Sequence, residues 1–327
     1  MKPQLVKTPA FSHEHFNLYH YHFVKNTTTQ TENSQRPIIL IVYALVNRPT
    51  ILNLDPKRSF IGKLCEAGCE VYLMDWGYPK PIAATLSLKN YALDFIDHAV
   101  EIILKQHQIA AINLMGICQG GVFSICYAAW QPGKVATLIP VVTPANFHTA
   151  DNLITPRINF ILTKYWVEKL GNFPGTTLGW FLTMLKPEHT LWNKFKRFLH
   201  IKEDSDELVL TLKMEQWIHD TPDHPGQVLI DFAQDFYVNN SFMKKEYALG
   251  NEKLSWSAIQ MPLLNVYALD DHLVPASAAI ALRQVVESNP HYEELSIPAG
   301  HIGLFVGRKS AETLPVQIKE WLTLKNI

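Results

Sequence analysis

Cys118 lies between two glycines in the stretch GICQGG, and this spacing could support nucleophilic catalysis. The apolar run AAINLM comes before it, and the helical stretch QGGVFSICYAAW follows it. A G-x-C-x-G turn between a strand and a helix is a cysteine version of the nucleophile elbow, in which small flanking residues let the backbone bend and expose the nucleophile. The helix N-terminus favours a thiolate, and the backbone N–H of Gln119 would face a developing oxyanion. The same pattern also fits a turn that buries an inert thiol. A catalytic role for Cys118 therefore also requires a base and an acid elsewhere in the sequence.

A thiol nucleophile needs a base, and the base needs an acid that orients it. After an elbow of this kind, the acid and then the histidine are expected on loops that follow later strands. The stretch ALDDHLVP places Asp270, Asp271 and His272 after one apolar run, and IPAGHIGLF places His301 after the next. The order of these residues predicts a Cys-Asp-His site. Spacing alone does not choose between the two aspartates or between the two histidines.

The elements that must position these residues follow from the hydrophobic pattern. Unbroken apolar runs are typical of strands in a parallel sheet that is covered on both faces. A helix opening at Ser87 has its apolar residues on one stripe, which completes a strand–helix–strand unit. A second amphipathic helix is predicted around residues 316–324. The predicted strands cover residues 38–45, 69–76, 110–115, 135–142, 262–269 and 293–297.

The segment 151–256 has a different character, because strand patterns give way to helical patterns rich in aromatic residues. Strand patterns then return after residue 257, which indicates one α/β domain with an insertion and not two successive domains. We therefore predict a core in two parts, residues 1–150 and 257–327, and a helical cap at 151–256. Within the cap, the apolar stretch 173–187 is expected to form a lid or core in preference to a polymer-binding surface.

Composition and the N-terminus exclude several classes of protein. A formal charge of −1 gives no electrostatic basis for nucleic-acid binding. The longest apolar run near the start, Ile38–Val46, has nine residues, against about 20 in a membrane-spanning helix. The first residues lack the pattern of a secretory signal, so we expect a cytoplasmic protein with reduced cysteines.

Two further groups of residues could suggest a metal site. Cys65 and Cys69 are four residues apart, but no second pair or suitable histidine spacing accompanies them, so they are expected to be apolar fillers. Histidines also alternate near the N-terminus, which is equally typical of a strand with one polar face. We therefore predict no metal. These histidines are His13, His15, His20 and His22.

Several long motifs resemble the poly(3-hydroxyalkanoate) synthases, and most closely the short catalytic subunits of the two-subunit type, class III. The resemblance runs in order from about residue 37 to the end of the chain. It is carried by GICQGG, VNRPTILNLDPKRSF (46–60), VYLMDWGYP (71–79), MEQWIHDTPD (214–223), YALDDHLVP (267–275) and AGHIGLFVG (299–307).

The resemblance implies an α/β-hydrolase fold, with a mostly parallel sheet and an inserted helical cap. It implies that Cys118 is the nucleophile, that Asp271 is the acid and that His301 is the base. The backbone N–H groups of Gln119 and of the loop around Val46 are then expected to form the oxyanion hole. His272 becomes a neighbour of the acid and not the catalytic imidazole.

The reaction implied is polymerisation of (R)-3-hydroxyacyl-coenzyme A, with 3-hydroxybutyryl as the expected acyl group and with coenzyme A (CoA) released. No cofactor is expected, since CoA is part of the substrate. The expected partners are a second synthase subunit, a second copy of this chain and the surface of a polymer granule in the cytoplasm. Two alternatives are a cysteine-dependent acyl-CoA thioesterase or acyltransferase and a non-catalytic binding protein. The non-catalytic binding protein is disfavoured, because a site that has lost its activity would not need all three residues of the Cys-Asp-His set.

Overall fold

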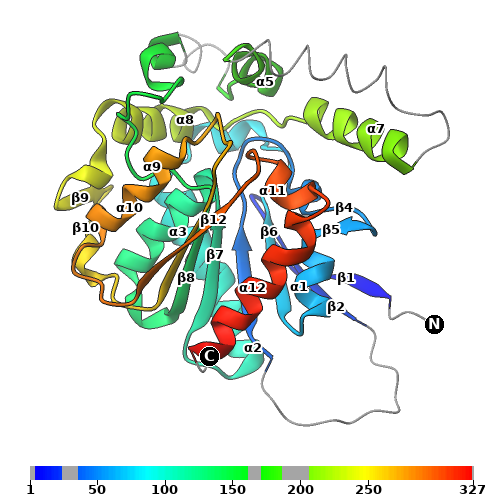
Figure 1. The fold of residues 1–327 in the computed structure, drawn as a ribbon. Helices are drawn as coiled ribbons and strands as arrows, with labels where there is room; N and C mark the ends of the chain where they lie inside the picture. Colours follow the sequence, from blue (N-terminus) through cyan, green and yellow to red (C-terminus); the bar gives the residue numbers. More distant parts are fainter. Residues whose placement is uncertain (1–3, 24–35, 161–170, 186–205, 326–327) are drawn as a thin grey trace.

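A central sheet organises the described part of the chain, which comprises residues 4–23, 36–160, 171–185 and 206–325 of this computed structural model (Figure 1). Its strands lie in the order β1-β2-β6-β3-β7-β8-β11-β12. From β6 to β12 every neighbouring pair is parallel, whereas β1 and β2 are antiparallel. The predicted parallel sheet is therefore confirmed. The bounds are β1 (Leu5–Ser12), β2 (Asn17–Phe23), β3 (Ile38–Val42), β6 (Glu70–Asp75), β7 (Ile112–Ile117), β8 (Val135–Val141), β11 (Leu263–Ala268) and β12 (Tyr292–Ile297).

The N-terminal residues form a hairpin at one edge of this sheet. The predicted N-terminal strand is present as β2, which contains His20 and His22, whereas His13 and His15 lie in the turn before it. The strand β1 was not predicted from the sequence. Its pattern is interrupted by Pro9, where the pairing register shifts, and a proline inside an apolar pattern argues against a strand.

Alternating residues of the parallel strands face two separate layers of helices. In β3, Leu40 and Val42 pack in the cluster that contains α2 and α3, whereas Ile39 and Ile41 pack in the cluster that contains α1 and α12. The helix predicted from Ser87 starts at Leu88, passes through a π-helical turn at Asn90–Asp94 and continues as α2. The bounds are α1 (Phe60–Glu66), α2 (Phe95–His107), α3 (Gln119–Trp130), α9 (Ala276–Ile280), α10 (Leu282–Val285), α11 (Gly303–Val306) and α12 (Ser310–Leu324), with a short hairpin of β4 (Asn53–Asp55) and β5 (Arg58–Ser59).

The segment between β8 and β11 contains the predicted helices α5 (Gly175–Met184), α7 (Asp206–His219) and α8 (Gly226–Phe232). These helices lie above one end of the strands of the sheet (Figure 1). The expectation of helices alone is wrong, because β9 (Glu246–Leu249) and β10 (Glu252–Ser255) form a hairpin there. Their length of four residues each is too short for a clear alternating pattern. Aromatic residues of this part, including Phe232, Phe236 and Trp256, join the core cluster of α3. The boundary at residue 256 stays a prediction.

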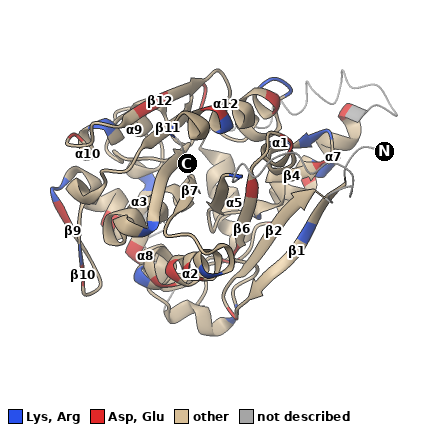
Figure 2. Cartoon of the chain, turned by 90° about the horizontal axis from the view of Figure 1, so that it is seen from below, with Lys and Arg blue, Asp and Glu red and all other residues tan. Residues whose placement is uncertain are grey.

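Charged residues of both signs are interspersed along the ribbon in Figure 2. Around the β9–β10 hairpin, for example, Lys244 and Lys245 adjoin Glu246, and Glu252 adjoins Lys253. Such mixing creates no extended field of one sign in this region. Among the helices of the described ranges, none is long and apolar enough to cross a membrane.

Candidate active site

Cys118 occupies the sharp turn between β7 and α3, as the motif predicts. Its backbone has φ 55° and ψ −119°, and its N–H donates to the carbonyl oxygen of Val141 at 2.9 Å. This hydrogen bond fixes the turn against the end of β8. Cys118 is partly exposed, whereas the other three cysteines, Cys65, Cys69 and Cys126, are buried.

The two glycines around Cys118 allow the turn to pack against neighbouring backbone. A Cβ atom on Gly120 would lie 2.2 Å from the carbonyl oxygen of Val42, at the end of β3. A Cβ atom on Gly116 would lie 2.5 Å from the Cα atom of Gly121. Both distances are far below van der Waals contact, so these positions have no room for a side chain.

We expect Gly120→Ala to lower the free energy of unfolding by about 2–3 kcal/mol, because the nearest atoms belong to backbone that cannot move aside cheaply. Gly133→Ala is the matched control, since a Cβ atom there would meet nothing within 4 Å. Urea denaturation of both variants checks this. Equal stability of the two variants would contradict the packing argument.

Asp271 and His301 meet beside this turn, because the carboxyl ends of the parallel strands β11 and β12 share one edge of the sheet. His301 Nδ1–H donates to Asp271 Oδ2 at 2.6 Å. The other carboxylate oxygen, Oδ1, accepts the backbone N–H groups of Leu273 at 2.8 Å and Val274 at 3.0 Å. Asp270, the alternative that spacing left open, is exposed. The structure therefore brings Asp271, and not its neighbour, against His301.

His301 and Cys118 line the same cavity, and the thiol is close enough to act on the pKa of the imidazole. Burial lowers the pKa of His301, but the charges of Asp271 and Cys118 and the hydrogen bonds to both outweigh it and raise the pKa well above the ordinary 6.5. An imidazole in this setting can hold a proton between the thiol and the carboxylate. This arrangement can activate a thiol for attack on a carbonyl carbon.

A cavity of about 340 Å³ opens onto Cys118 and His301. His272, the other histidine that spacing left open, also lines it. The helices α5, α7 and α8 contribute apolar walls to the cavity, and the role of residues 173–187 as a lid stays a prediction. The apolar lining includes Val46, Ile154, Ile158, Leu178, Phe181, Leu182, Met214, Leu229 and Phe232.

Gln119 and Val46, the residues expected to supply the oxyanion amides, both line this cavity. Gln119 is the first residue of α3, and Val46 lies in the loop after β3, here called the β3 loop (residues 43–48). Within the described ranges, no group accepts a hydrogen bond from either backbone N–H. Two unpaired amides beside a nucleophile are suited to stabilising negative charge on a carbonyl oxygen.

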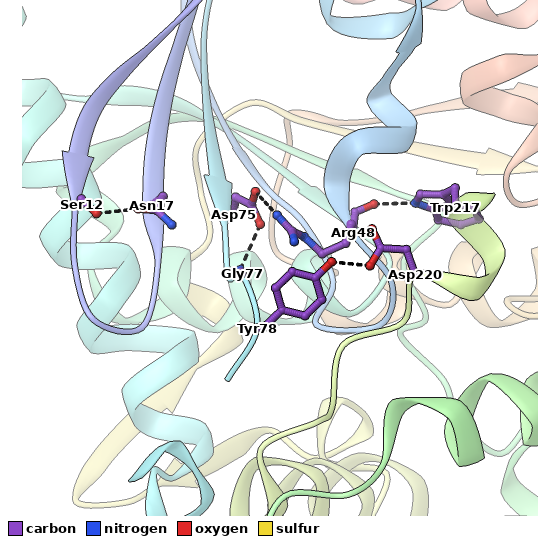
Figure 3. A network of polar contacts seen from close by, with 8 residues as sticks. All are labelled: Ser12, Asn17, Arg48, Asp75, Gly77, Tyr78, Trp217 and Asp220. Atoms are coloured by element: carbon purple, nitrogen blue, oxygen red, sulfur yellow. Dashed lines mark hydrogen bonds and ion pairs between the residues drawn. The ribbon is translucent and has the colours of Figure 1, made fainter. Parts of the chain in front are cut away.

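A polar network attaches the β3 loop to the end of α7 (Figure 3). Arg48 forms an ion pair with Asp75 at 2.7 Å, and its guanidinium lies over the ring of Tyr78. The hydroxyl of Tyr78 donates to Asp220, and the indole N–H of Trp217 donates to the carbonyl oxygen of Arg48 at 2.7 Å. These contacts fix the loop from the side of the cap.

His224 is a cavity residue that the sequence analysis missed. It is 1% exposed, and its Nε2 lies 3.3 Å from the side-chain Nε2 of Gln119. Burial lowers its pKa from 6.5 to about 4. The two residues are 105 positions apart in the sequence, so nothing local pairs them. The chain has 14 histidines, and no pattern distinguishes this one.

The lowered pKa of His224 predicts acid sensitivity. Between pH 6.5 and pH 4 the unfolded chain binds a proton here that the folded chain does not, so stability falls as the pH falls through this window. The full loss attributable to this group is about 3 kcal/mol. Denaturant unfolding at several pH values checks it, and His224→Gln should flatten the slope. An unchanged slope in that variant would contradict the buried neutral imidazole.

No group of three or more histidine, cysteine, aspartate or glutamate side chains in the described ranges is placed to hold a metal ion. The expected role of Cys65 and Cys69 as fillers agrees with their burial in the core.

Comparison with known proteins agrees with this architecture. The family described as alpha/beta hydrolase fold matches residues 37–308. Among solved structures, an esterase from Thermogutta terrifontis has a TM-score of 0.57 at 15% identity, covering 99% of this chain and 100% of its own. A monoacylglycerol lipase from Paleococcus ferrophilus has a TM-score of 0.55 at 16% identity, covering 89% and 96%. At these identities the likeness concerns the fold alone, and it confirms the predicted fold class.

Curated relatives are much closer in sequence. A poly(3-hydroxyalkanoate) polymerase subunit PhaC from Allochromatium vinosum is 38% identical over 316 residues, which is 97% of this chain and 88% of that protein. The subunit of the same name from Synechocystis sp. is 38% identical over 291 residues, 87% of this chain and 77% of that protein. The resemblance found in the motifs is thereby confirmed. The chain belongs to the family of poly(3-hydroxyalkanoate) polymerase subunits named PhaC, acyltransferases built on the α/β-hydrolase fold.

Proposed function

We propose that this protein polymerises (R)-3-hydroxyacyl-CoA, with 3-hydroxybutyryl as the main acyl group, through a thioester on Cys118. The observation that carries the proposal is the hydrogen-bonded pair of Asp271 and His301 at an apolar cavity that Cys118 and His301 both line. Membership of the polymerase family supports the same activity.

In the first step His301 takes the proton of the Cys118 thiol, and the sulfur attacks the carbonyl carbon of the substrate thioester. The electron pair moves to the carbonyl oxygen, where the amides of Gln119 and Val46 stabilise it. When this electron pair returns from the oxygen to re-form the carbonyl group, the bond to the CoA sulfur breaks. The CoA sulfur leaves with the proton held by His301. The acyl group is then attached to Cys118.

In the second step the hydroxyl of another hydroxyacyl unit attacks this thioester. His301 takes the hydroxyl proton, an ester bond forms, and the bond to the Cys118 sulfur breaks. The Cys118 sulfur then takes the proton back. Asp271 orients the imidazole through its hydrogen bond to Nδ1, or assists the hydroxyl directly.

A cysteine suits this sequence of steps better than a serine does. Exchange of one thioester for another changes the energy little, so the acyl group stays activated on the enzyme. The favourable conversion of thioester to ester is then kept for chain elongation. Water would divert the same intermediate to a free acid, and the apolar lining of the cavity favours its exclusion.

The proposal includes the expected partners. A second synthase subunit is part of it, because the relatives are described as polymerase subunits. A homodimer and contact with a polymer granule in the cytoplasm complete the proposal. No cofactor takes part in the reaction as written.

The test measures CoA release from (R)-3-hydroxybutyryl-CoA with a thiol-reactive dye, with and without a candidate second subunit, while the product is collected. CoA release with insoluble polymer supports the proposal. Release with soluble 3-hydroxy acid identifies a thioesterase, the alternative activity of this site. Absence of CoA release even with the second subunit contradicts both.

A further inference from the structure

The side chain of Gln119 joins the two parts of the chain that carry the proposed oxyanion amides. Its Oε1 accepts the backbone N–H of Leu45 at 3.0 Å. Leu45 immediately precedes Val46 in the β3 loop, and Gln119 itself supplies the other amide. The distance between the two amides therefore depends on where this side chain is held.

The orientation of the Gln119 carboxamide follows from its partners. A backbone N–H can only donate, so the oxygen faces Leu45 and the NH₂ group faces Nε2 of His224. That nitrogen must accept, which places the ring proton on Nδ1, where it donates to the carbonyl oxygen of Pro225 at 3.2 Å. Each polar atom of the pair then has a partner with a neutral imidazole.

His224 is a fixed point for this chain of contacts. Its backbone N–H donates to the carbonyl oxygen of Phe173 at 2.8 Å, and its own carbonyl accepts the N–H of Phe173 at 2.8 Å. The residue is 1% exposed to solvent, and its ring is held by the hydrogen bond of Nδ1 to Pro225. The ring cannot follow Gln119 if that side chain moves, so it acts as a rigid support.

We propose that His224 is a positioning residue for acyl transfer, which fixes the separation of the Gln119 and Val46 amides through the Gln119 side chain. The inference rests on the proposed acyl transfer at Cys118. Without the imidazole, the NH₂ group of Gln119 faces an apolar wall and the side chain turns toward other partners. The β3 loop then loses the hydrogen bond at Leu45, and the two amides no longer converge on one oxygen atom.

The test compares two reactions of the same thiol. Acylation by 3-hydroxybutyryl-CoA creates an oxyanion, whereas alkylation by iodoacetamide displaces iodide and creates none. We expect His224→Leu to slow acylation by about 10- to 100-fold, the effect of a misplacement near 1 Å, and to leave alkylation unchanged. His224→Gln should restore most of the rate, since its Oε1 can reach the position of Nε2 and accept from Gln119.

A second variant keeps the test valid if His224→Leu does not fold. His224→Asn can replace the hydrogen bond of Nδ1 to Pro225 but is too short to replace Nε2, so it should show the same selective loss. Gln119→Leu retains the backbone N–H but removes the link, and adding a His224 substitution to it should have no further effect. Equal loss of both reactions in a folded His224 variant, or a full additional loss in the Gln119→Leu background, would overturn the proposal.

Failure of the proposed role of His224 can be distinguished from failure of the proposed polymerisation. The acylation rate is read from the first release of CoA, before any polymer can form. If the wild-type protein is not acylated by the CoA thioester, the proposed substrate fails, and a nitrophenyl ester replaces it as the acyl donor for the same comparison of variants.

Discussion

Cys118→Ala is expected to fold normally and to take up no acyl group from a hydroxyacyl-CoA. The loss of activity should approach the 10⁶-fold effect that follows removal of a nucleophile from an acyl-transfer triad. Alanine keeps the Cβ atom and the backbone geometry of the turn, so the cavity and the Asp271–His301 pair should remain. Radiolabelled acyl-CoA, followed by denaturation and counting of bound label, measures the covalent step directly.

Cys126→Ala is the matched control, because this thiol lies in α3, the helix that follows Cys118, but is fully buried. Burial first, and then the charge of Asp235, raise the pKa of Cys126, so it has no reactive thiolate. Burial likewise raises the pKa of Cys65 and of Cys69 to about 12. Covalent label that persists in Cys118→Ala would show that another group carries the acyl chain.

Asp271→Asn is expected to reduce chain elongation by about 10⁴-fold, as the equivalent change does in hydrolase triads. The asparagine oxygen should stay with the N–H groups of Leu273 and Val274, which leaves its NH₂ group facing Nδ1 of His301. That nitrogen must then accept, so the proton moves to Nε2 and the imidazole can no longer act as a base. Acylation should fall less, because a thiol needs less help from a base than a hydroxyl does.

Single-turnover release of CoA measures acylation, and polymer formed per unit time measures elongation. Asp270→Asn is the control, since this neighbouring carboxylate is exposed. An equal loss of both rates would contradict the weaker need of the thiol for a base, and it would leave Asp271 with no separate role toward the hydroxyl. Wild-type rates in this variant would remove Asp271 from the mechanism.

Much of this architecture could be predicted from the sequence, because its signals are local. The glycines around Cys118 and the apolar run before it define a strand and a turn, and the helix Gln119–Trp130 was predicted with its observed bounds. Parallel strands then bring their carboxyl ends to one edge. This arrangement of parallel strands is enough to predict that the loops with Asp271 and His301 lie beside the elbow. It does not distinguish Asp271 from Asp270, or His301 from His272.

The contacts that refine the site could not be predicted in this way. The pairing of Gln119 with His224 depends on how the cap meets the core, and side chains so distant in sequence leave no periodic pattern. The hairpin β9–β10 was missed because its strands are short, and β1 because Pro9 interrupts its pattern. Each of these features is decided by tertiary packing, which overrides local preference.

The positive-φ backbone at Cys118 sets stability against the proposed activity at a single position. A residue with a side chain costs about 1–3 kcal/mol in such a conformation, whereas glycine adopts it freely. Cys118 has φ 55°, so the residue that would make the fold most stable here is one that cannot hold an acyl group. A laboratory selection for thermostability alone would therefore drift toward glycine at position 118 and lose the chemistry, unless activity were selected in parallel.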